Sequence, residues 1–301
     1  MRPSFLKNWR EGPFAVGRLK ALHVRLAPGG RSHLPSPDEE EFAFVLEGTP
    51  DLWVDGSLYR LGEGDGVAMP ARTAVSQCLI NNTDREVRLF VLGEGARVGS
   101  RPSLAEPGPT AKRKRGRPDR VVHWREILNR KAARYPDSDE DQGIAASFAK
   151  RARLSTIGIH AVLLKPGRRT SYPHAERDED EFAYVVSGRV EAWTDGHIAP
   201  MREGDFIGWE AGTGVTHVIL NNSDADALLL IGGEASKARN QYWYPYHPSR
   251  NKAAGANYWA DHPMPKLGPH DGLPDALRAK LPKRAQRDAR TANKAALRTR
   301  R

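Results

Sequence analysis

Four side chains in the second half of the chain have the types and spacing of a metal-binding group. Residues 171–185 read SYPHAERDEDEFAYV, in which His174 and Glu176 lie two positions apart and so share one side of an extended chain. Glu181 begins an apolar run, and its parity with Ala183 and the next alternate residues predicts a carboxylate that faces a strand interior. A buried carboxylate is costly unless it is paired or bound to a metal. His217, within VTHVILNN, is predicted to face the same interior from another strand.

Two imidazoles with one or two carboxylates form a ligand set for one divalent metal ion. Zn, Fe, Mn and Ni are all compatible, whereas soft-metal sites need thiolates and the chain has a single cysteine, Cys78. Two carboxylates would neutralise a 2+ ion, and further coordination positions would be open to a ligand or to oxygen. Glu176 is a fourth ligand, a base, or a group that orients His174. The alternative is a solvated loop pair, His174 and Glu176, beside a hydrogen-bonded strand histidine, His217.

The elements that must position these residues occur twice, because the chain contains an internal duplication. With a shift of 140 residues, 38–94 aligns with 178–234 without a gap. DEEEFAFVLEG falls on DEDEFAYVVSG, EGDGVAMPARTAV on EGDFIGWEAGTGV, and INNTD on LNNSD. The matching stretches NWRE (8–11) and HWRE (123–126) indicate that each unit begins with an equivalent arm. A repeat of this length predicts two copies of one domain.

The first copy lacks most of the candidate ligands. The residues in the places of His174, Glu176, Glu181 and His217 are, in that order, Leu34, Ser36, Glu41 and Gln77. We therefore predict that the first copy holds no metal and serves packing, dimerisation or closure over a ligand. The alternative is a decayed duplicate that is kept because the second copy needs the buried surface.

Short strands dominate each unit. EFAFVLEG and EFAYVVSG are β-branched and aromatic runs, and Asp55-Gly56 and Asp195-Gly196 are typical of tight hairpin turns. Many short strands at ~8–12-residue spacing predict a sandwich or barrel. Helix is expected over 124–134 and in the C-terminal tail.

The predicted domains are an N-terminal barrel over 1–98, a basic Pro/Gly linker over 99–120 and a C-terminal barrel over 121–250. An irregular flap and a basic tail follow over 251–301. The stretch NQYWYPYHPSRN (240–251) is too aromatic for a disordered tail and is expected to pack over a barrel.

The spacing of the polar residues resembles the two motifs of the cupin superfamily of small jelly-roll barrels. The second copy supplies the matching positions Gly167, His174, Glu176, Glu181, Gly188, Gly204, Glu210, Gly212, His217 and Asn221, with Glu176 in place of a histidine and Glu210 in place of a proline. The resemblance implies an all-β bicupin with two tandem jelly-roll barrels, short helical arms and a basic, partly disordered tail. It also implies a metal-dependent activity such as dioxygenase, sugar isomerase or epimerase, or decarboxylase, without choosing among them.

The net charge of +10 is concentrated outside the repeats. The run KRKRGRPDR (112–120) holds six Lys or Arg against one Asp, and residues 274–301 hold ten against two. Arg115, Gly116, Arg117 and Pro118 resemble the core of an AT-hook, which places arginines in a narrow minor groove. Asp119 stands where such hooks continue with basic residues. The alternative to a metal-dependent function is therefore a non-catalytic sensor or a protein that associates with DNA through the linker and tail. For the basic run itself, we prefer the interpretation of a charged linker that binds no DNA.

Composition indicates a soluble protein of a reducing compartment. No apolar run approaches the ~20 residues that span a bilayer, and MRPSFLKNWREGPF lacks the apolar core of a signal peptide. We expect a cytoplasmic protein whose partner is a small polar organic molecule and which does not bind membranes. Homodimerisation stays open.

Overall fold

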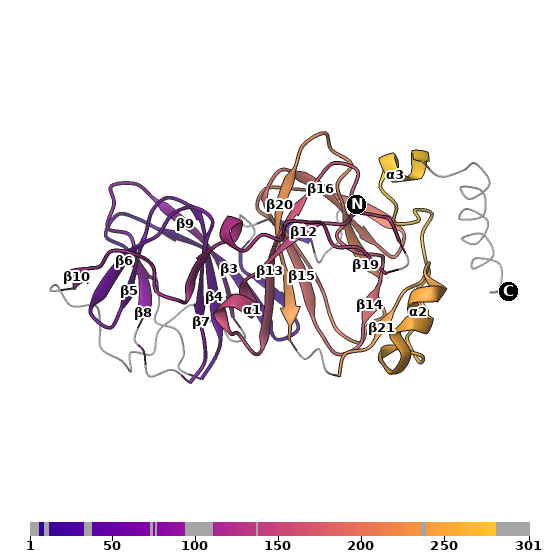
Figure 1. Cartoon of the computed structure of the whole chain (residues 1–301), viewed down its shortest axis with the longest axis horizontal. Helices are drawn as coiled ribbons and strands as arrows, with labels where there is room; N and C mark the ends of the chain where they lie inside the picture. Colours follow the sequence, from indigo (N-terminus) through magenta and orange to yellow (C-terminus); the bar gives the residue numbers. More distant parts are fainter. Residues whose placement is uncertain are drawn as a thin grey trace.

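The structure, a computed structural model, describes residues 6–8, 12–32, 38–72, 75, 77–93, 111–136, 138–235 and 239–280. Two β-barrels lie side by side, and helices α2 (Pro248–Ala254) and α3 (Asp275–Lys280) lie beyond the C-terminal barrel, at the end away from the N-terminal one (Figure 1). The predicted all-β architecture of two tandem barrels is confirmed.

The C-terminal barrel consists of a six-stranded sheet in the order β1-β18-β15-β20-β13-β12 and a three-stranded sheet in the order β17-β16-β19. The strands are β1 (Leu6–Asn8), β12 (Ile144–Ser147), β13 (Ile157–Leu164), β15 (Glu181–Ser187), β16 (Arg189–Thr194), β17 (His197–Arg202), β18 (Asp205–Trp209), β19 (His217–Leu220) and β20 (Ala227–Glu234). Alternate residues such as Val162, Ala183 and Leu229 fill the barrel. The hairpin predicted at Asp195-Gly196 joins β16 to β17, with positive φ at both residues.

The N-terminal barrel repeats this plan, with sheets in the orders β11-β7-β4-β9-β3-β2 and β10-β6-β5-β8. Its strands are β2 (Phe14–Val16), β3 (Leu19–Leu26), β4 (Glu41–Glu47), β5 (Asp51–Val54), β6 (Ser57–Arg60), β7 (Asp65–Met69), β8 (Gln77–Ile80), β9 (Val87–Gly93), β10 (Lys112–Arg113) and β11 (Val121–His123). A second hydrophobic cluster, which includes Val45, Leu52 and Leu89, fills this barrel.

Each barrel borrows a strand from the segment that precedes the other. β1 pairs with β18 of the C-terminal barrel, where Asn8 donates a 2.7 Å hydrogen bond to Asp205. β11 pairs with β7 of the N-terminal barrel, with Val121 opposite Val67. The boundaries placed at 98 and 121 from the sequence therefore do not follow the sheets. The internal repeat indicates that the two N-terminal arms are equivalent. It does not predict which sheet edge each arm pairs with.

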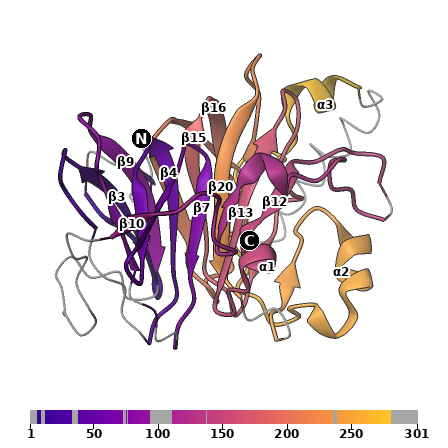
Figure 2. The same ribbon diagram turned by 60° about the vertical axis from the view of Figure 1, so that its left-hand side comes forward.

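The two six-stranded sheets pack face to face through a shared aromatic core (Figure 2). The equivalent positions Phe42 and Phe182, and Phe44 and Tyr184, meet there, together with Phe90 from the first barrel and Phe206 from the second. The rings of Phe90 and Tyr184 lie 4.8 Å apart. Buried aromatic side chains contribute large hydrophobic stabilisation, so the first barrel has a packing role for the second whatever else it does.

The helix expected over 124–134 forms only as a short 3-10 helix at Trp124–Glu126. Ala133 instead donates its N–H to Gly143 and accepts one from Gln142, so the segment pairs with the chain leading into β12. This pairing overrides a local helix preference that is itself weak. Helix α1 (Phe148–Ala152) follows β12. Among the helices of the described ranges, none has the length and apolar character needed to cross a membrane.

The segment after β20 packs over the C-terminal barrel, as its aromatic content predicted. Strand β21 (Tyr242–Trp243) pairs with β14 (Ala175–Glu176), and a 3-10 helix at Gly255–Asn257 follows α2. Further on, the indole N–H of Trp193 donates to the carbonyl of His270 at 2.9 Å. Residues 259–274, between this 3-10 helix and α3, form no helix or strand. Of the linker predicted over 99–120, residues 99–110 lie outside the described residues, and so do residues 281–301 of the flap and tail predicted over 251–301.

Candidate metal centre

Two histidines reach the interior of the C-terminal barrel from chain segments that are paired with each other. His174 ends the loop before β14, and His217 begins β19. The N–H of His217 donates to the carbonyl of His174 at 2.9 Å, and the reverse bond measures 3.3 Å. This isolated bridge fixes the two backbones side by side, and the ring centroids lie 5.0 Å apart.

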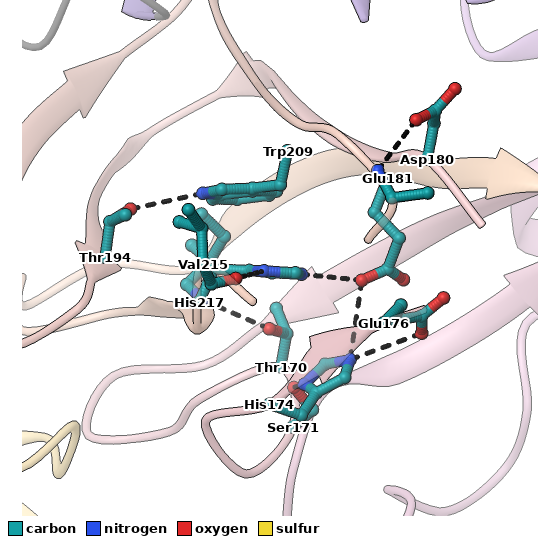
Figure 3. A network of polar contacts seen from close by, with 12 residues as sticks. Thr170, Ser171, His174, Glu176, Asp180, Glu181, Thr194, Trp209, Val215 and His217 are labelled. Carbon is teal, nitrogen blue, oxygen red and sulfur yellow. Dashed lines mark hydrogen bonds and ion pairs between the residues drawn. The ribbon is translucent and has the colours of Figure 1, made fainter. Parts of the chain in front are cut away.

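Glu181, at the start of β15, points between the two imidazoles (Figure 3). Its Oε2 lies 2.6 Å from Nε2 of His217 and 3.4 Å from Nε2 of His174. One ligand atom from each of the three residues lies within 4.8 Å of the others. The predicted convergence of His174, Glu181 and His217 is what the folded chain shows, and the three could hold one divalent ion.

Backbone carbonyls determine which imidazole nitrogen faces the centre. Nδ1 of His174 lies 2.9 Å from the carbonyl of Tyr172, and Nδ1 of His217 lies 3.2 Å from that of Val215. A carbonyl only accepts hydrogen bonds, so each Nδ1 carries the proton and each Nε2 is directed inward. Fixing the tautomer in this way is the usual second contact of a metal-ligating histidine.

The carboxylate of Glu181 and the protonated imidazole of His174 stabilise each other's charged forms. Burial alone would raise the pKa of Glu181, but hydrogen bonds from His174 and His217 outweigh it and hold the pKa far below its usual range. Burial would lower the pKa of His174, and its contacts with Glu176 and Glu181 raise it well above 6.5 instead. Without metal, the cluster therefore favours a carboxylate facing a protonated imidazole. A divalent cation would replace that proton as the partner of Glu181.

Glu176, the fourth predicted ligand, lies at the edge of this cluster. Its Oε1 is 3.5 Å from Nε2 of His174, and its Oε2 accepts a 2.6 Å hydrogen bond from Nδ2 of Asn240. Burial and the neighbouring charge of Glu181 raise the pKa of Glu176. Asn240 is fully buried, and its Oδ1 also accepts the N–H of Asp178. Sequence reasoning missed Asn240, because it lies outside the repeat; the signal was its position at the start of the aromatic stretch 240–251.

Replacing Asn240 by leucine is expected to weaken metal binding about tenfold, because changes in groups that orient metal ligands cost roughly 10–100-fold in affinity. Leucine keeps the branched shape of the side chain but leaves Glu176 without its donor. Competition titration with a chelator measures the change. Asn222→Leu is the control, since Asn222 donates to Glu191 away from the centre. Unchanged affinity in a folded Asn240→Leu protein would show that Asn240 does not position Glu176 for the metal.

Comparison with known proteins agrees with this geometry. The family described as Cupin domain matches the chain twice, over residues 22–93 and 160–232, once in each barrel. The protein is a bicupin. No curated protein matches it.

Solved structures similar to this bicupin share its fold at low identity. Salicylate 1,2-dioxygenase from Pseudaminobacter salicylatoxidans is 15% identical, with a TM-score of 0.55, over 75% of this chain and 74% of that chain. A mutant of Bacillus subtilis oxalate decarboxylase is 15% identical, with a TM-score of 0.53, over 80% and 79%. AerE from Microcystis aeruginosa is 16% identical, with a TM-score of 0.51, over 74% and 90%. These likenesses establish the fold, and function has to be argued from the site.

A cavity of about 200 Å³ adjoins the candidate ligands of the bicupin. Trp209 forms one wall and stacks on His217 at 4.1 Å, and its indole N–H donates to Thr194. The ring of Tyr244, from the segment after β21, stacks on His174 at 5.7 Å. The two histidines are therefore each held by an aromatic side chain as well as by hydrogen bonds.

In the first barrel of the bicupin, the positions equivalent to the candidate metal ligands carry different side chains. Gln77 stands where the second barrel has His217, and its Oε1 accepts a 2.5 Å hydrogen bond from Arg120. A guanidinium there repels a divalent cation. Glu41 is buried, whereas the side chain of Glu181 is 24% exposed. Leu34 and Ser36 lie outside the described residues. The Gln77–Arg120 pair supports the prediction of a metal-free first barrel.

The hook-like run of the bicupin is partly folded against the first barrel. Arg113, in β10, makes a bidentate ion pair with the fully buried Asp51. Arg117 lies 2.7 Å from Glu126 and 3.2 Å from Asp65. Arg115 and Gly116 are exposed, and Pro118 is half-buried. DNA recognition by Arg115–Pro118 stays a prediction, and it would require Arg117 to leave two carboxylates.

Proposed function

We propose that the C-terminal barrel of this bicupin binds one divalent metal ion and, with it, binds or transforms a small organic molecule. The observation that carries the proposal is the convergence of Nε2 of His174, Nε2 of His217 and a carboxylate oxygen of Glu181 beside a cavity. Nitrogen and oxygen donors suit Mn, Fe, Ni or Zn. Mn(II) is the first ion to test, since a study of oxalate decarboxylase, which shares this fold, concerns its Mn(II) centres.

When bound, such an ion would supply a Lewis acid and open coordination positions for a substrate oxygen or dioxygen. The chain supplies the rest. His174, Glu181 and His217 would fix the ion, and the wall around Trp209 would limit the water that reaches it. Glu176 has a raised pKa and is held at Oε2 by Asn240, which leaves Oε1 to accept or return a substrate proton. This set of groups suits a metal-dependent dioxygenase or isomerase.

Metal analysis of the purified protein tests the proposal. We expect one transition-metal ion per chain, and a lowered melting temperature after chelation, because a ligand that binds only the folded state stabilises it. His217→Ala should lose the ion, whereas His197→Ala, which removes an exposed histidine of the same barrel, should retain it. Full metal content in the His217→Ala protein would show that the site is wrong. A metal-loaded protein that binds ligands without turnover would be a sensor rather than an enzyme.

A further inference from the structure

The described walls of the metal-site cavity carry no permanent positive charge. Among the described residues that line it, none is lysine or arginine. Val162 of β13, Ile219 of β19 and Ile231 of β20 face it together with Trp209. Its remaining polar groups outside the candidate ligands are His160, Thr170 and Ser171. The cavity thus has a charged end at the metal ligands and a largely apolar remainder.

Charge balance limits what this cavity can hold. The Glu181 carboxylate offsets one charge of a 2+ ion and Glu176 lies beside it, so the metal end carries at most one surplus positive charge. A ligand with one anionic oxygen can share the metal. A second anionic group lying against the apolar wall would lose part of its hydration, and none of the described residues that line the cavity is a lysine or arginine that could pair with it, which is unfavourable.

The volume of the cavity further limits the class of ligand that fits. A cavity of about 150 Å³ lined by apolar side chains accommodates benzene, and this cavity measures about 200 Å³. A ligand with a single ring, or a branched aliphatic group of similar size, therefore fits, together with two adjacent oxygen donors. Thr170 and Ser171, on the loop that delivers His174, add hydroxyl groups to the wall, and the Ser171 hydroxyl lies on the Nδ1 side of His174.

We propose that the ligand of this site is a small oxygen chelator with no more than one negative charge and an apolar remainder of about ring size, and that the site rejects dicarboxylates. This inference rests on the proposed function. The donor atoms contact the metal, and the apolar part lies against Val162, Ile219 and Ile231.

Mandelate and malate provide a matched pair of probes. Both are α-hydroxy acids with the same two donor oxygens. Mandelate carries a phenyl ring on the α-carbon, whereas malate carries a CH2 group with a second carboxylate. With Mn(II)-loaded protein at pH 8, calorimetry and the Mn(II) resonance spectrum should show mandelate binding at least about tenfold more tightly than malate. Equal or tighter binding of malate overturns the proposal, and so does metal-loaded protein that binds neither. Protein that takes up none of Mn(II), Fe(II), Ni(II) and Zn(II) would instead overturn the proposed function.

A charge introduced into the apolar wall tests the cause. Ile231 is half-buried, and it lies opposite both Ala183 and His160 in the sheet. Ile231→Arg should improve malate binding at least about tenfold while weakening that of mandelate. Ala225→Arg, on an exposed turn of the same barrel, raises the net charge by the same amount and should change neither. If Ile231→Arg does not fold, as judged by circular dichroism and metal content, His160→Arg introduces the cation from the neighbouring strand. A folded variant with unchanged selectivity would overturn the explanation by charge.

Discussion

Glu181→Gln is expected to weaken metal binding by about 100-fold or more, because removing one of a few ligands costs roughly 3 kcal/mol of the total that holds an ion in a protein site. The amide is nearly isosteric, so the fold should persist. The substitution removes the carboxylate that lies 2.6 Å from His217 and 3.4 Å from His174. Competition with a chelator measures the affinity, and the melting temperature of Glu181→Gln should no longer respond to chelation.

The internal duplication supplies a matched control for this substitution. Glu41 occupies the place of Glu181 in the first barrel and is likewise the first residue of its strand. Glu41→Gln should leave metal affinity unchanged. If Glu41→Gln lost metal affinity and Glu181→Gln retained it, our proposal would have placed the metal in the wrong barrel.

Glu40→Gln is expected to destabilise the protein by about 3 kcal/mol, because hydrogen bonds to charged groups contribute roughly 1.5–3 kcal/mol each and buried donors left unpaired are costly. The buried Glu40 carboxylate accepts hydrogen bonds from the backbone N–H groups of Ser155, Thr156 and Ile157 and from two hydroxyls. These donors belong to the segment entering β13 of the other barrel. Urea unfolding measures the loss, and Glu39→Gln, on the neighbouring residue, is the control.

The effect of Glu40 should depend on pH. Burial would raise its pKa, but the hydrogen bonds from Ser155 and Thr156 outweigh this and lower it from 4.5. A carboxyl group whose folded pKa is depressed stabilises the fold above its unfolded pKa, and the contribution is lost as pH falls through the folded value. The difference between wild type and Glu40→Gln should therefore be full at pH 7 and shrink below about pH 4. A constant difference across this range would show that the charge of Glu40 is not what stabilises the contact.

Local sequence patterns were sufficient for the barrels and for most of the site. Strand alternation placed Glu181 on the same face as Ala183 and Val185, and the structure shows these two residues in the barrel core. The repeat identified which histidines were specific to the second copy. Both signals act within one strand or one hairpin, where side-chain direction follows directly from backbone periodicity.

Long-range contacts were beyond the sequence. Local preference predicted a helix over 124–134, but pairing with residues before β12 decided otherwise. The run around Arg117 was interpreted by its own charge, whereas its partners Asp65 and Glu126 became visible only in the folded chain. Opposite charges find each other through the tertiary structure, so a charge count cannot show which cations remain free.

The sequence by itself determined that this protein has two related β-barrels and that His174, Glu181 and His217 share the interior of the second. Only the tertiary structure decided that the barrels exchange their first strands, that Asn240 holds Glu176, and that Arg120 contacts Gln77 in the first barrel. The physical reason is the same in each case. Periodicity fixes which way a side chain points along its own strand, but the partner it meets there comes from a distant segment whose position depends on the packing of the whole chain.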